Sequence, residues 1–391
     1  MLLSRQTKLR RMNILINALG ITDSGGIAVL DKFLYECLKD PLDRRYLIIA
    51  NDNVNIMKLL GKYKESTLFK FLFINNKGFI HRLFYENLIF RGLVKEHCID
   101  LIYNFSGTAQ FFTKVPQLVK VHNLLFYSKK LDGFYQEKRL FLRWFKDIFV
   151  KRIVFIQMFN FATHLEIQSS HVKQILSDFI NTKSKLLYIK SDIDVSDNAF
   201  YIPRQYDFSK KIKFLYIVGP HFESLHKNLQ DFTNAMMNLT EAGVDFEINI
   251  TLTNDQLKNS KVWDASLNSK TNFLGYISDH EKMKELFCDN TILISTSVIE
   301  TLGLHVIEGI KNGIITITPN ESYARTVYGG NMFQYELFNR DSLVATIMSI
   351  INCKESYGEN ILSIQDDLRQ SEMSKFSSIL DVFDEVLNVQ K

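Results

Sequence analysis

Two acidic residues lie where a predicted strand gives way to a predicted helix. Residues 295–319 read STSVIETLGLHVIEGIKNGIITITP, and seven residues separate Glu300 from Glu308. With Glu300 in the loop and Glu308 about two turns into the helix, each carboxylate can accept hydrogen bonds from a different hydroxyl group of a ligand.

The backbone between these acids also offers chemistry. We expect a strand to end near Thr296, a helix to begin near Leu302 and Gly313 to end that helix. Gly303 lets the backbone approach a ligand closely, and the exposed N–H groups at the positive end of the helix dipole form an anion site suited to a diphosphate. A nucleotide sugar carries a diphosphate and two sets of hydroxyl groups, so this segment indicates a nucleotide-sugar site.

Short apolar runs alternate with helical patterns along the chain and must position this site. Such alternation predicts an α/β protein with parallel sheets, whose ligands bind at the carboxyl ends of the strands. The strands expected in the first half are 13–18, 46–50, 71–74, 100–105, 118–122, 164–169 and 186–189, and those in the second half are 214–218, 246–252, 272–276, 291–296 and 314–318.

The length of 391 residues favours two domains. The pattern restarts after a polar, acid-rich segment, which predicts an interdomain linker at 191–210. The flanking domains are then 12–190 and 211–375. Residues 376–391 are expected to form a C-terminal helix that packs back on the first domain, and residues 1–11 receive no role.

The segment around the two acids resembles the E-x7-E signature of the retaining glycosyltransferases of family 4. That signature reads roughly E-G-F-G-L-x-x-x-E-A-M-x-x-G-x-P-V, where this chain has E-T-L-G-L-H-V-I-E-G-I-K-N-G-I-I-T from Glu300 onward. The resemblance covers roughly residues 12–375. It implies the GT-B fold, in which two Rossmann-like doubly wound domains face each other across a cleft, and it implies transfer of a sugar with its anomeric configuration retained.

Residues 214–228, FLYIVGPHFESLHKN, resemble the family's opening of the nucleotide-binding domain. The family has a Gly and then a Lys directed at the diphosphate there, and Gly219 and Lys227 match them. Pro220 stands where the family often has Arg, so one of two usual cationic phosphate contacts is missing or comes from elsewhere. His221 or His226 would be a weak substitute.

A segment further along the chain also matches the family's order. FLGYISDHEKMKEL at 273–286 resembles the segment bordering the base, so Tyr276 and Ile277 would flank the nucleobase. Ser278 and Glu281 look like a capping box for the next helix; a plain strand end and helix cap would look the same.

On the opposite side of the cleft, the resemblance gives roles to a glycine pair and a histidine. Gly25 and Gly26 match a Gly-Gly loop that closes over the diphosphate or the acceptor, although turn geometry alone also explains such a pair. His122, at the end of a predicted strand, matches a histidine near the transferred sugar; a strand-end histidine is otherwise usually structural.

The resemblance assigns the remaining roles residue by residue. Lys227 and the backbone around Gly303 and Leu304 would hold the diphosphate, with Thr301 and Leu302 bordering it, while Glu308 binds the ribose and Glu300 the donor sugar. His122 would position that sugar. No cofactor and no metal is expected.

Composition and other motifs exclude several classes. Hydrophobic residues make up 46% of the chain and charged residues 23%, as in folded globular proteins. The net charge of +4 indicates no global attraction to nucleic acid. The four dispersed cysteines favour a reducing compartment and no zinc site, and no run is apolar enough to span a membrane. The D-x-D at 192–194 falls in the linker, and G-x-G-x-x-G is missing after both opening strands, which disfavours metal-nucleotide and dinucleotide sites.

A basic, aromatic segment at 129–152 holds eight Lys or Arg against three acids. Such a helix suits an anionic membrane surface, and it equally suits a helix with an aromatic core-facing side. RNA binding is weaker because no recognition motif accompanies the charge.

The sequence therefore predicts a glycosyltransferase that uses a nucleotide-sugar donor and a glycan or polyprenyl-diphosphate-linked acceptor in O-antigen or capsule synthesis. We expect it in the cytoplasm, peripheral to the inner face of the plasma membrane. Two alternatives stay open: a GT-B sugar-nucleotide epimerase or hydrolase, and a non-catalytic GT-B scaffold protein.

Overall fold

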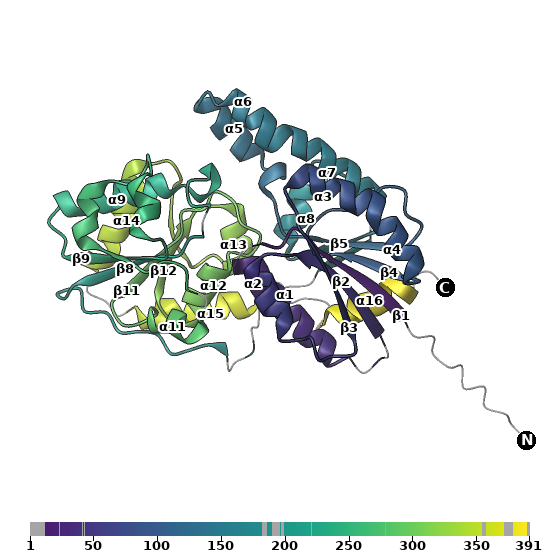
Figure 1. Ribbon diagram of the computed structural model, residues 1–391. Helices are drawn as coiled ribbons and strands as arrows, with labels where there is room; N and C mark the ends of the chain where they lie inside the picture. The colour runs from purple at the N-terminus through teal and green to yellow at the C-terminus, as the bar shows by residue number, and fades with distance from the viewer. Residues whose placement is uncertain are drawn as a thin grey trace, which may run out of the picture.

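The computed structural model describes residues 12–22, 24–40, 42, 44–181, 186–189, 196, 199–219, 221–277, 279–353, 357–370 and 378–388. They form two α/β lobes side by side, each built on a parallel sheet (Figure 1). The predicted fold class, with two doubly wound parallel sheets, is confirmed.

The N-terminal lobe contains a seven-stranded sheet in the order β3-β2-β1-β4-β5-β6-β7. Each described pairing is parallel, as in Ile14 opposite Tyr46 and Val119 opposite Leu165. The strands are β1 (Met12–Ala18), β2 (Arg44–Asn51), β3 (Phe69–Ile74), β4 (Leu101–Asn104), β5 (Gln117–Val121), β6 (His164–Ile167) and β7 (Leu186–Ile189).

The C-terminal lobe repeats this design with a six-stranded sheet in the order β10-β9-β8-β11-β12-β13. Its strands are β8 (Ile212–Tyr216), β9 (Phe246–Ile250), β10 (Thr271–Phe273), β11 (Thr291–Ile294), β12 (Ile315–Pro319) and β13 (Phe333–Tyr335). Of these strands, β13 was not among those expected from the sequence.

Both faces of each sheet are covered by helices, which explains why the strands are nearly continuous apolar runs. In β1, Ile14 and Ile16 pack with α1, α2 and α16, whereas Leu15 packs on the opposite face with Phe90 of α4. The helices in chain order are α1 (Ser24–Leu38), α2 (Val54–Gly61), α3 (Phe79–Phe84), α4 (Phe90–Glu96), α5 (Lys129–Glu137), α6 (Phe141–Trp144), α7 (Val150–Phe161), α8 (Ser170–Ser177), α9 (Leu229–Glu241), α10 (Asn254–Lys258), α11 (His280–Glu285), α12 (Leu304–Lys311), α13 (Ser322–Tyr328), α14 (Arg340–Asn352), α15 (Gly358–Gln370) and α16 (Ile379–Asn388).

The last helix, α16, lies against the N-terminal lobe (Figure 1). Its Val382 and Phe383 are fully buried in the core that contains β1 and α1. The Arg44 guanidinium forms an ion pair with Asp384 of α16. The chain thus crosses between lobes twice, because β8 opens the C-terminal lobe and α16 returns to the first one.

The basic segment forms a two-helix arm rather than one helix. α5 is followed by α6, the π-helical turn η3 (Phe145–Phe149) and α7, and the arm projects beyond the N-terminal sheet (Figure 1). Its aromatic residues divide between two environments: Phe134 and Tyr135 are buried, whereas Phe141 and Phe145 are exposed. Within the described ranges, no helix combines the length and apolar character needed to cross a bilayer.

Several predicted positions lie outside the described residues: 1–11, the D-x-D at 192–194, Pro220 and Ser278. The predicted linker at 191–210, which lies partly outside them, separates β7 from β8.

Candidate active site

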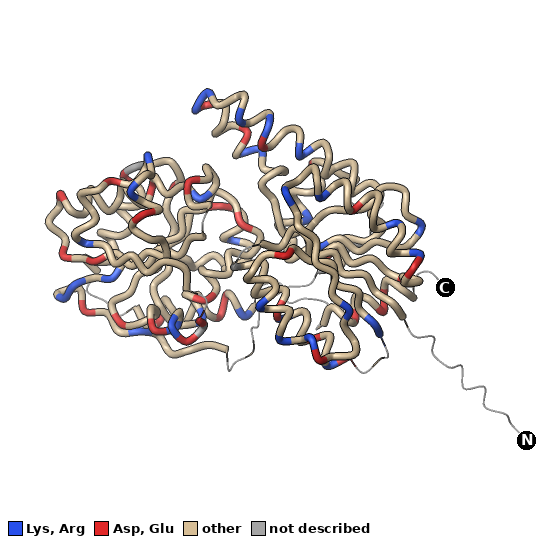
Figure 2. Tube along the Cα trace, in the orientation of Figure 1, with Lys and Arg blue, Asp and Glu red and all other residues tan. Residues whose placement is uncertain are grey.

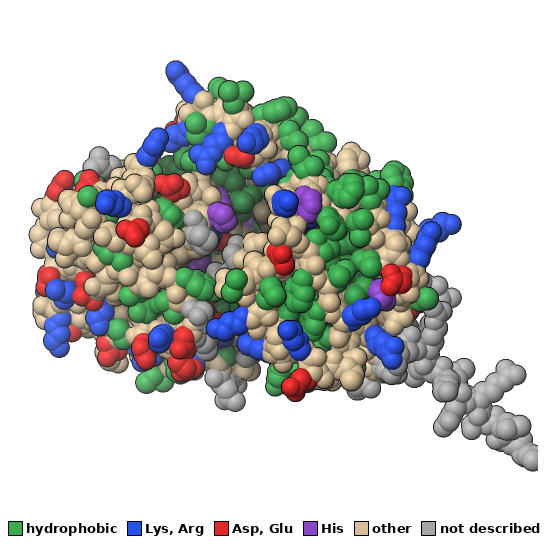
Figure 3. Space-filling view, in the orientation of Figure 1, with side chains coloured by type: hydrophobic (Ala, Val, Ile, Leu, Met, Phe, Trp, Pro, Cys, Tyr) green, Lys and Arg blue, Asp and Glu red, His purple; other side chains and the backbone are tan. Residues whose placement is uncertain are grey.

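A cleft of about 630 Å³ separates the two lobes at the carboxyl ends of their strands. Figure 3 shows the hollow between the lobes, with histidine side chains at its border. Its walls contain every predicted site residue except Glu308, namely Gly25, Gly26, His122, Gly219, Lys227, Tyr276, Ile277, Glu300, Thr301, Leu302, Gly303 and Leu304. Residues predicted from segments far apart in sequence therefore share one cavity.

Lys227 and Glu300 form an ion pair in the wall of the C-terminal lobe. The Lys227 ammonium donates to Glu300 Oε1 at 2.7 Å, and both side chains are mostly buried. The backbone is fixed as well, since the Thr296 hydroxyl donates to the Lys227 carbonyl at 2.7 Å and the Val298 N–H donates to the His226 carbonyl at 2.7 Å. The loops after β8 and β11 are thereby held together.

The charge state of this pair follows from its surroundings. Burial opposes ionisation of Glu300, but the Lys227 ammonium, together with His305 and the Ser297 side chain, lowers the pKa of Glu300 to about 2. Burial lowers the pKa of neighbouring His305 to about 4, so His305 is neutral near pH 7. The cleft therefore holds one ionised carboxylate against one ammonium group here.

Gly303 is the N-cap of α12 and adopts the left-handed conformation, with φ of 59°. A Cβ at this position would clash with the Tyr328 hydroxyl, which donates to the Leu302 carbonyl at 2.8 Å. The Leu304 and His305 N–H groups have no acceptor within the helix, whereas the Val306 N–H donates to the Gly303 carbonyl at 2.9 Å. Gly303, Leu304 and His305 line the cleft. This helix end is suited to a diphosphate, although the helix begins at Leu304, two residues later than expected.

Glu308 lies apart from the other predicted residues. Its carboxylate is 38% exposed, and Oε1 lies 3.9 Å from the Lys311 ammonium. It is not among the residues that line the cleft.

Two local expectations were wrong. Gly25 and Gly26 lie in the first turn of α1 rather than in a loop. The N-cap of α11 is Asp279, whose carboxylate accepts from the Glu281 N–H. Glu281 therefore stands two residues after the N-cap, and not three as a capping box requires. An Asp serves as N-cap as well as a Ser does, so sequence could not separate the adjacent candidates.

Sequence reasoning missed several cleft residues of the N-terminal lobe, Lys120 and Gln168 above all. The Lys120 ammonium donates to Glu166 Oε1 at 2.7 Å, and the Tyr103 hydroxyl donates to Glu166 Oε2 at 2.5 Å. The signal was a charged residue within each of two apolar strands, two positions before His122 and Gln168. Because side chains alternate along a strand, Lys120 and His122 share a face.

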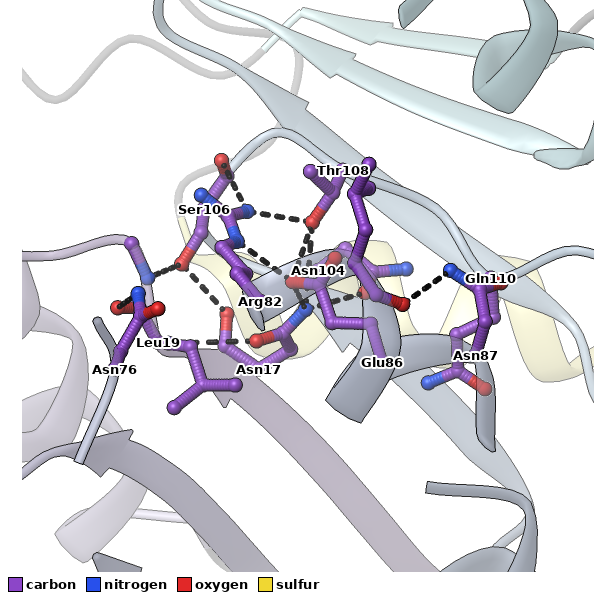
Figure 4. A network of polar contacts seen from close by, with 12 residues as sticks. Asn17, Leu19, Asn76, Arg82, Glu86, Asn87, Asn104, Ser106, Thr108 and Gln110 are labelled. Carbon is purple, nitrogen blue, oxygen red and sulfur yellow. Dashed lines mark hydrogen bonds and ion pairs between the residues drawn. The ribbon is translucent and has the colours of Figure 1, made fainter. Parts of the chain in front are cut away.

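A buried polar network supports the loops on this side of the cleft (Figure 4). Glu86 Oε1 accepts from Asn17 at the end of β1, from Arg82 at 2.8 Å and from the Thr108 hydroxyl at 2.7 Å. The Ser106 hydroxyl accepts from the Gly20 N–H at 2.9 Å. The network fixes the loops after β1 and β4, which carry the facing wall of the cleft.

Among the described residues, no three His, Cys, Asp or Glu side chains gather as a metal-binding group.

Comparison with known proteins now adds to this geometry. Residues 202–361 match the family model described as "Glycosyl transferases group 1", a segment that contains the whole six-stranded sheet. This part of the chain is therefore similar to group 1 glycosyltransferase domains. Comparison with curated protein sequences gives no significant match.

Solved structures with the same fold cover nearly all of the chain. The apo form of the lipopolysaccharide outer core galactosyltransferase WaaB is 14% identical, with a TM-score of 0.64 over 97% of this chain and 100% of that one. A mutant of TarM from S. aureus, in complex with Fondaparinux, alpha-GlcNAc-glycerol and UDP, is 12% identical, with a TM-score of 0.61 over 97% and 99%. UDP-GlcNAc 2-epimerase from Methanocaldococcus jannaschii is 12% identical, with a TM-score of 0.51 over 96% and 100%. The fold is therefore GT-B.

Proposed function

We propose that this protein is a retaining glycosyltransferase of family 4, which moves a hexose-type sugar from a nucleoside-diphosphate sugar to a glycan acceptor. The Lys227–Glu300 pair carries the proposal, because it puts a cation for a diphosphate beside a carboxylate for sugar hydroxyls at one helix N-terminus. The group 1 domain match and the UDP complex of TarM support a nucleotide-sugar donor.

Binding of the donor follows from the cleft walls. Lys227 and the first-turn N–H groups of α12 hold the diphosphate and stabilise the charge that develops on the leaving group. Glu300 accepts hydrogen bonds from the sugar hydroxyls, and His122 positions the sugar from the facing lobe. Tyr276 and Ile277 flank the base, and Glu308 turns toward the ribose at the edge of the cleft.

In the proposed scheme retention arises because the acceptor attacks from the face that the diphosphate leaves. The acceptor oxygen bonds to the anomeric carbon as the bond to the phosphate oxygen breaks, and the acceptor proton passes to that departing oxygen. No metal takes part in this scheme. Inversion of the product anomer, measured by NMR of the purified glycan, would refute it.

The acceptor is proposed to be lipid-linked, as in O-antigen or capsule synthesis at the inner face of the plasma membrane. The arm supports this because Phe141, Leu142 and Phe145 are 58%, 89% and 52% exposed, and because Lys and Arg positions recur along the arm (Figure 2). Exposed apolar groups with surrounding cations favour an anionic bilayer. Sedimentation with phosphatidylglycerol vesicles should decrease in Leu142→Ser/Phe145→Ser, and unchanged sedimentation would contradict membrane binding.

The test of donor binding is a thermal-shift panel of nucleoside diphosphates and nucleotide sugars without metal. A ligand at 100 times its dissociation constant adds about 2.7 kcal/mol of stability. Stabilisation by one nucleotide family, weakened in Lys227→Ala, is expected. If no nucleotide stabilises the protein, the donor site is wrong and a scaffold role takes its place.

An epimerase or hydrolase is the second candidate, favoured by the similarity to UDP-GlcNAc 2-epimerase. Such an enzyme converts the donor in the absence of any acceptor. Incubation of the identified donor alone, followed by chromatography of the sugar nucleotide, separates the two, since the transferase leaves most of the donor intact.

A further inference from the structure

A second cavity, of about 570 Å³, opens between the arm and the loop after β8. It shares Gly219 and Lys227 with the donor cleft, so the two spaces meet at the proposed diphosphate site. A molecule in the second cavity could thus reach the donor sugar. None of the roles assigned so far uses this space.

The arm side of the cavity combines cations with an apolar wall. Arg143 and Lys151 line it together with Phe126, Tyr135 and Ile148, all three of which are buried. The Lys151 ammonium lies 5.8 Å from the centre of the Phe126 ring. This wall can bind an anion next to an apolar or sugar-ring surface.

The charges of the cavity favour an anionic ligand. Its described lining holds three cations, Arg143, Lys151 and Lys227, and one acid, Asp147, which lies 3.5 Å from Arg143. Lys227 is paired with Glu300 and Arg143 with Asp147, whereas Lys151 has no acidic partner among the described residues. A phosphate would therefore compete with Asp147 for Arg143 and meet no such competitor at Lys151. Burial and the nearby Lys227 lower the pKa of His226 to about 4, so it adds no charge near pH 7.

The arm also bridges the lobes beside this cavity. The Phe134 ring stacks on Phe338 of the C-terminal lobe with centroids 4.4 Å apart, and the Lys130 ammonium forms an ion pair with Glu321. These contacts hold Leu131 and Tyr135 of α5 in the cavity wall. The space is consequently bordered by both lobes.

We propose that the second cavity is the acceptor site and that it binds an acceptor bearing a phosphate ester, with Arg143 and Lys151 as the phosphate-binding residues. This inference rests on the proposed glycosyl transfer. The phosphate ester can belong to a soluble sugar phosphate or to a lipid-linked glycan, and the shared chemistry is the phosphate beside an apolar or ring surface.

The test is calorimetric titration of the full chain with phenyl phosphate, after saturation with the nucleoside diphosphate that stabilises the protein. Saturation occupies Lys227 and leaves the second cavity as the site measured. Arg143→Gln/Lys151→Gln should weaken binding about tenfold, because each cation contributes a charge-assisted hydrogen bond partly screened by solvent. Arg139→Asn/Lys146→Gln is the matched control, since it removes two arm cations that do not line the cavity; its affinity should be unchanged.

Each outcome decides between defined statements. Equal weakening in both double variants assigns the effect to general charge and overturns the site, as does the lack of phenyl phosphate binding in the wild type. Normal nucleotide binding by the Arg143→Gln/Lys151→Gln protein keeps the donor site, whatever the result with phenyl phosphate. Failure of the wild type to bind any nucleotide refutes the proposed function itself. Glucose 1-phosphate binding more tightly than octyl phosphate assigns a soluble source, and the reverse order assigns a lipid-linked one.

Discussion

Substitutions of Lys227 and of Glu300 are expected to change nucleoside diphosphate affinity in opposite directions. The Lys227 ammonium donates to Glu300 at 2.7 Å, so a diphosphate must compete with that carboxylate. Glu300→Gln removes the competitor and keeps the side-chain shape. We therefore expect nucleoside diphosphate to bind Glu300→Gln more tightly than wild type, while sugar transfer is lost.

The magnitude follows from the electrostatics of the pair. Lowering the pKa of Glu300 from 4.5 to about 2, against the opposing effect of burial, corresponds to about 3 kcal/mol in favour of its ionised form. The diphosphate recovers only part of this energy, because Glu300 and Lys227 are 17% and 25% exposed and water screens them. A gain of about 1 kcal/mol, or roughly fivefold in affinity, is the reasonable expectation.

Calorimetric titration at pH 7 measures this directly in wild type, Glu300→Gln and Lys227→Gln. Lys227→Gln should weaken diphosphate binding about tenfold or more, since it removes a charge-assisted contact. If Glu300→Gln weakens binding by the same factor as Lys227→Gln, the carboxylate is needed to orient the lysine and the competition argument is refuted.

Three further outcomes are expected. Gly303→Ala should unfold at lower temperature and lose nucleotide binding, because its φ of 59° and the clash with the buried Tyr328 hydroxyl both oppose a side chain. Gly25→Ala has open space around its Cβ and should keep its stability within about 1 kcal/mol in thermal melts. Glu166→Gln should cost about 3 kcal/mol or more in urea unfolding, because it leaves the buried Lys120 ammonium without its carboxylate; an unchanged midpoint would contradict a structural pair. The pKa of His305 is lowered to about 4, so on acidification the unfolded state takes up the proton first, and stability is lost as pH falls from about 6.5 toward 4. The urea midpoint of His305→Gln should therefore depend less on pH over this window than that of wild type. Identical slopes of urea midpoint against pH would refute the assignment.

The sequence predicted the two sheets well for a physical reason. Strands buried on both faces, such as Ile292 to Ile294 in β11, read as apolar runs that few helices imitate. The short edge strand β13 gives no such run, and the arm gave an ambiguous pattern because Phe134 is buried between lobes while Phe141 is exposed. Exposure of this kind depends on contacts across the chain, such as that between Phe134 and Phe338, which a single sequence does not contain.

Site residues could be predicted where the local sequence determines their geometry, and not where contacts with residues distant in sequence determine it. Gly303 and Glu300 could be identified because a strand, a loop and a helix start follow one another in sequence. A charge within an apolar strand marks Lys120 and Glu166 separately, but their pairing could not be predicted, because Glu166 is 46 residues away and is brought opposite Lys120 by the parallel register of β5 and β6. Long-range pairing of this sort is decided by the sheet order.

Both lysines that line the cleft are paired with an acid, and this bears on how the proposed donor would be recognised. Lys120 is held by Glu166 at the N-terminal wall, and Lys227 by Glu300 at the facing wall. Each lysine faces a carboxylate, which limits the cost of burying either group. In the proposed function a diphosphate competes with Glu300 for Lys227, whereas Glu166 is held in addition by the Tyr103 hydroxyl. When Lys227 turns to the phosphates, Glu300 loses its cation in a buried wall and needs hydrogen-bond donors, which the hydroxyls of a donor sugar supply. Binding of the diphosphate and of the sugar is thereby coupled through one carboxylate, so a nucleotide sugar satisfies the site in a way that a nucleoside diphosphate alone does not.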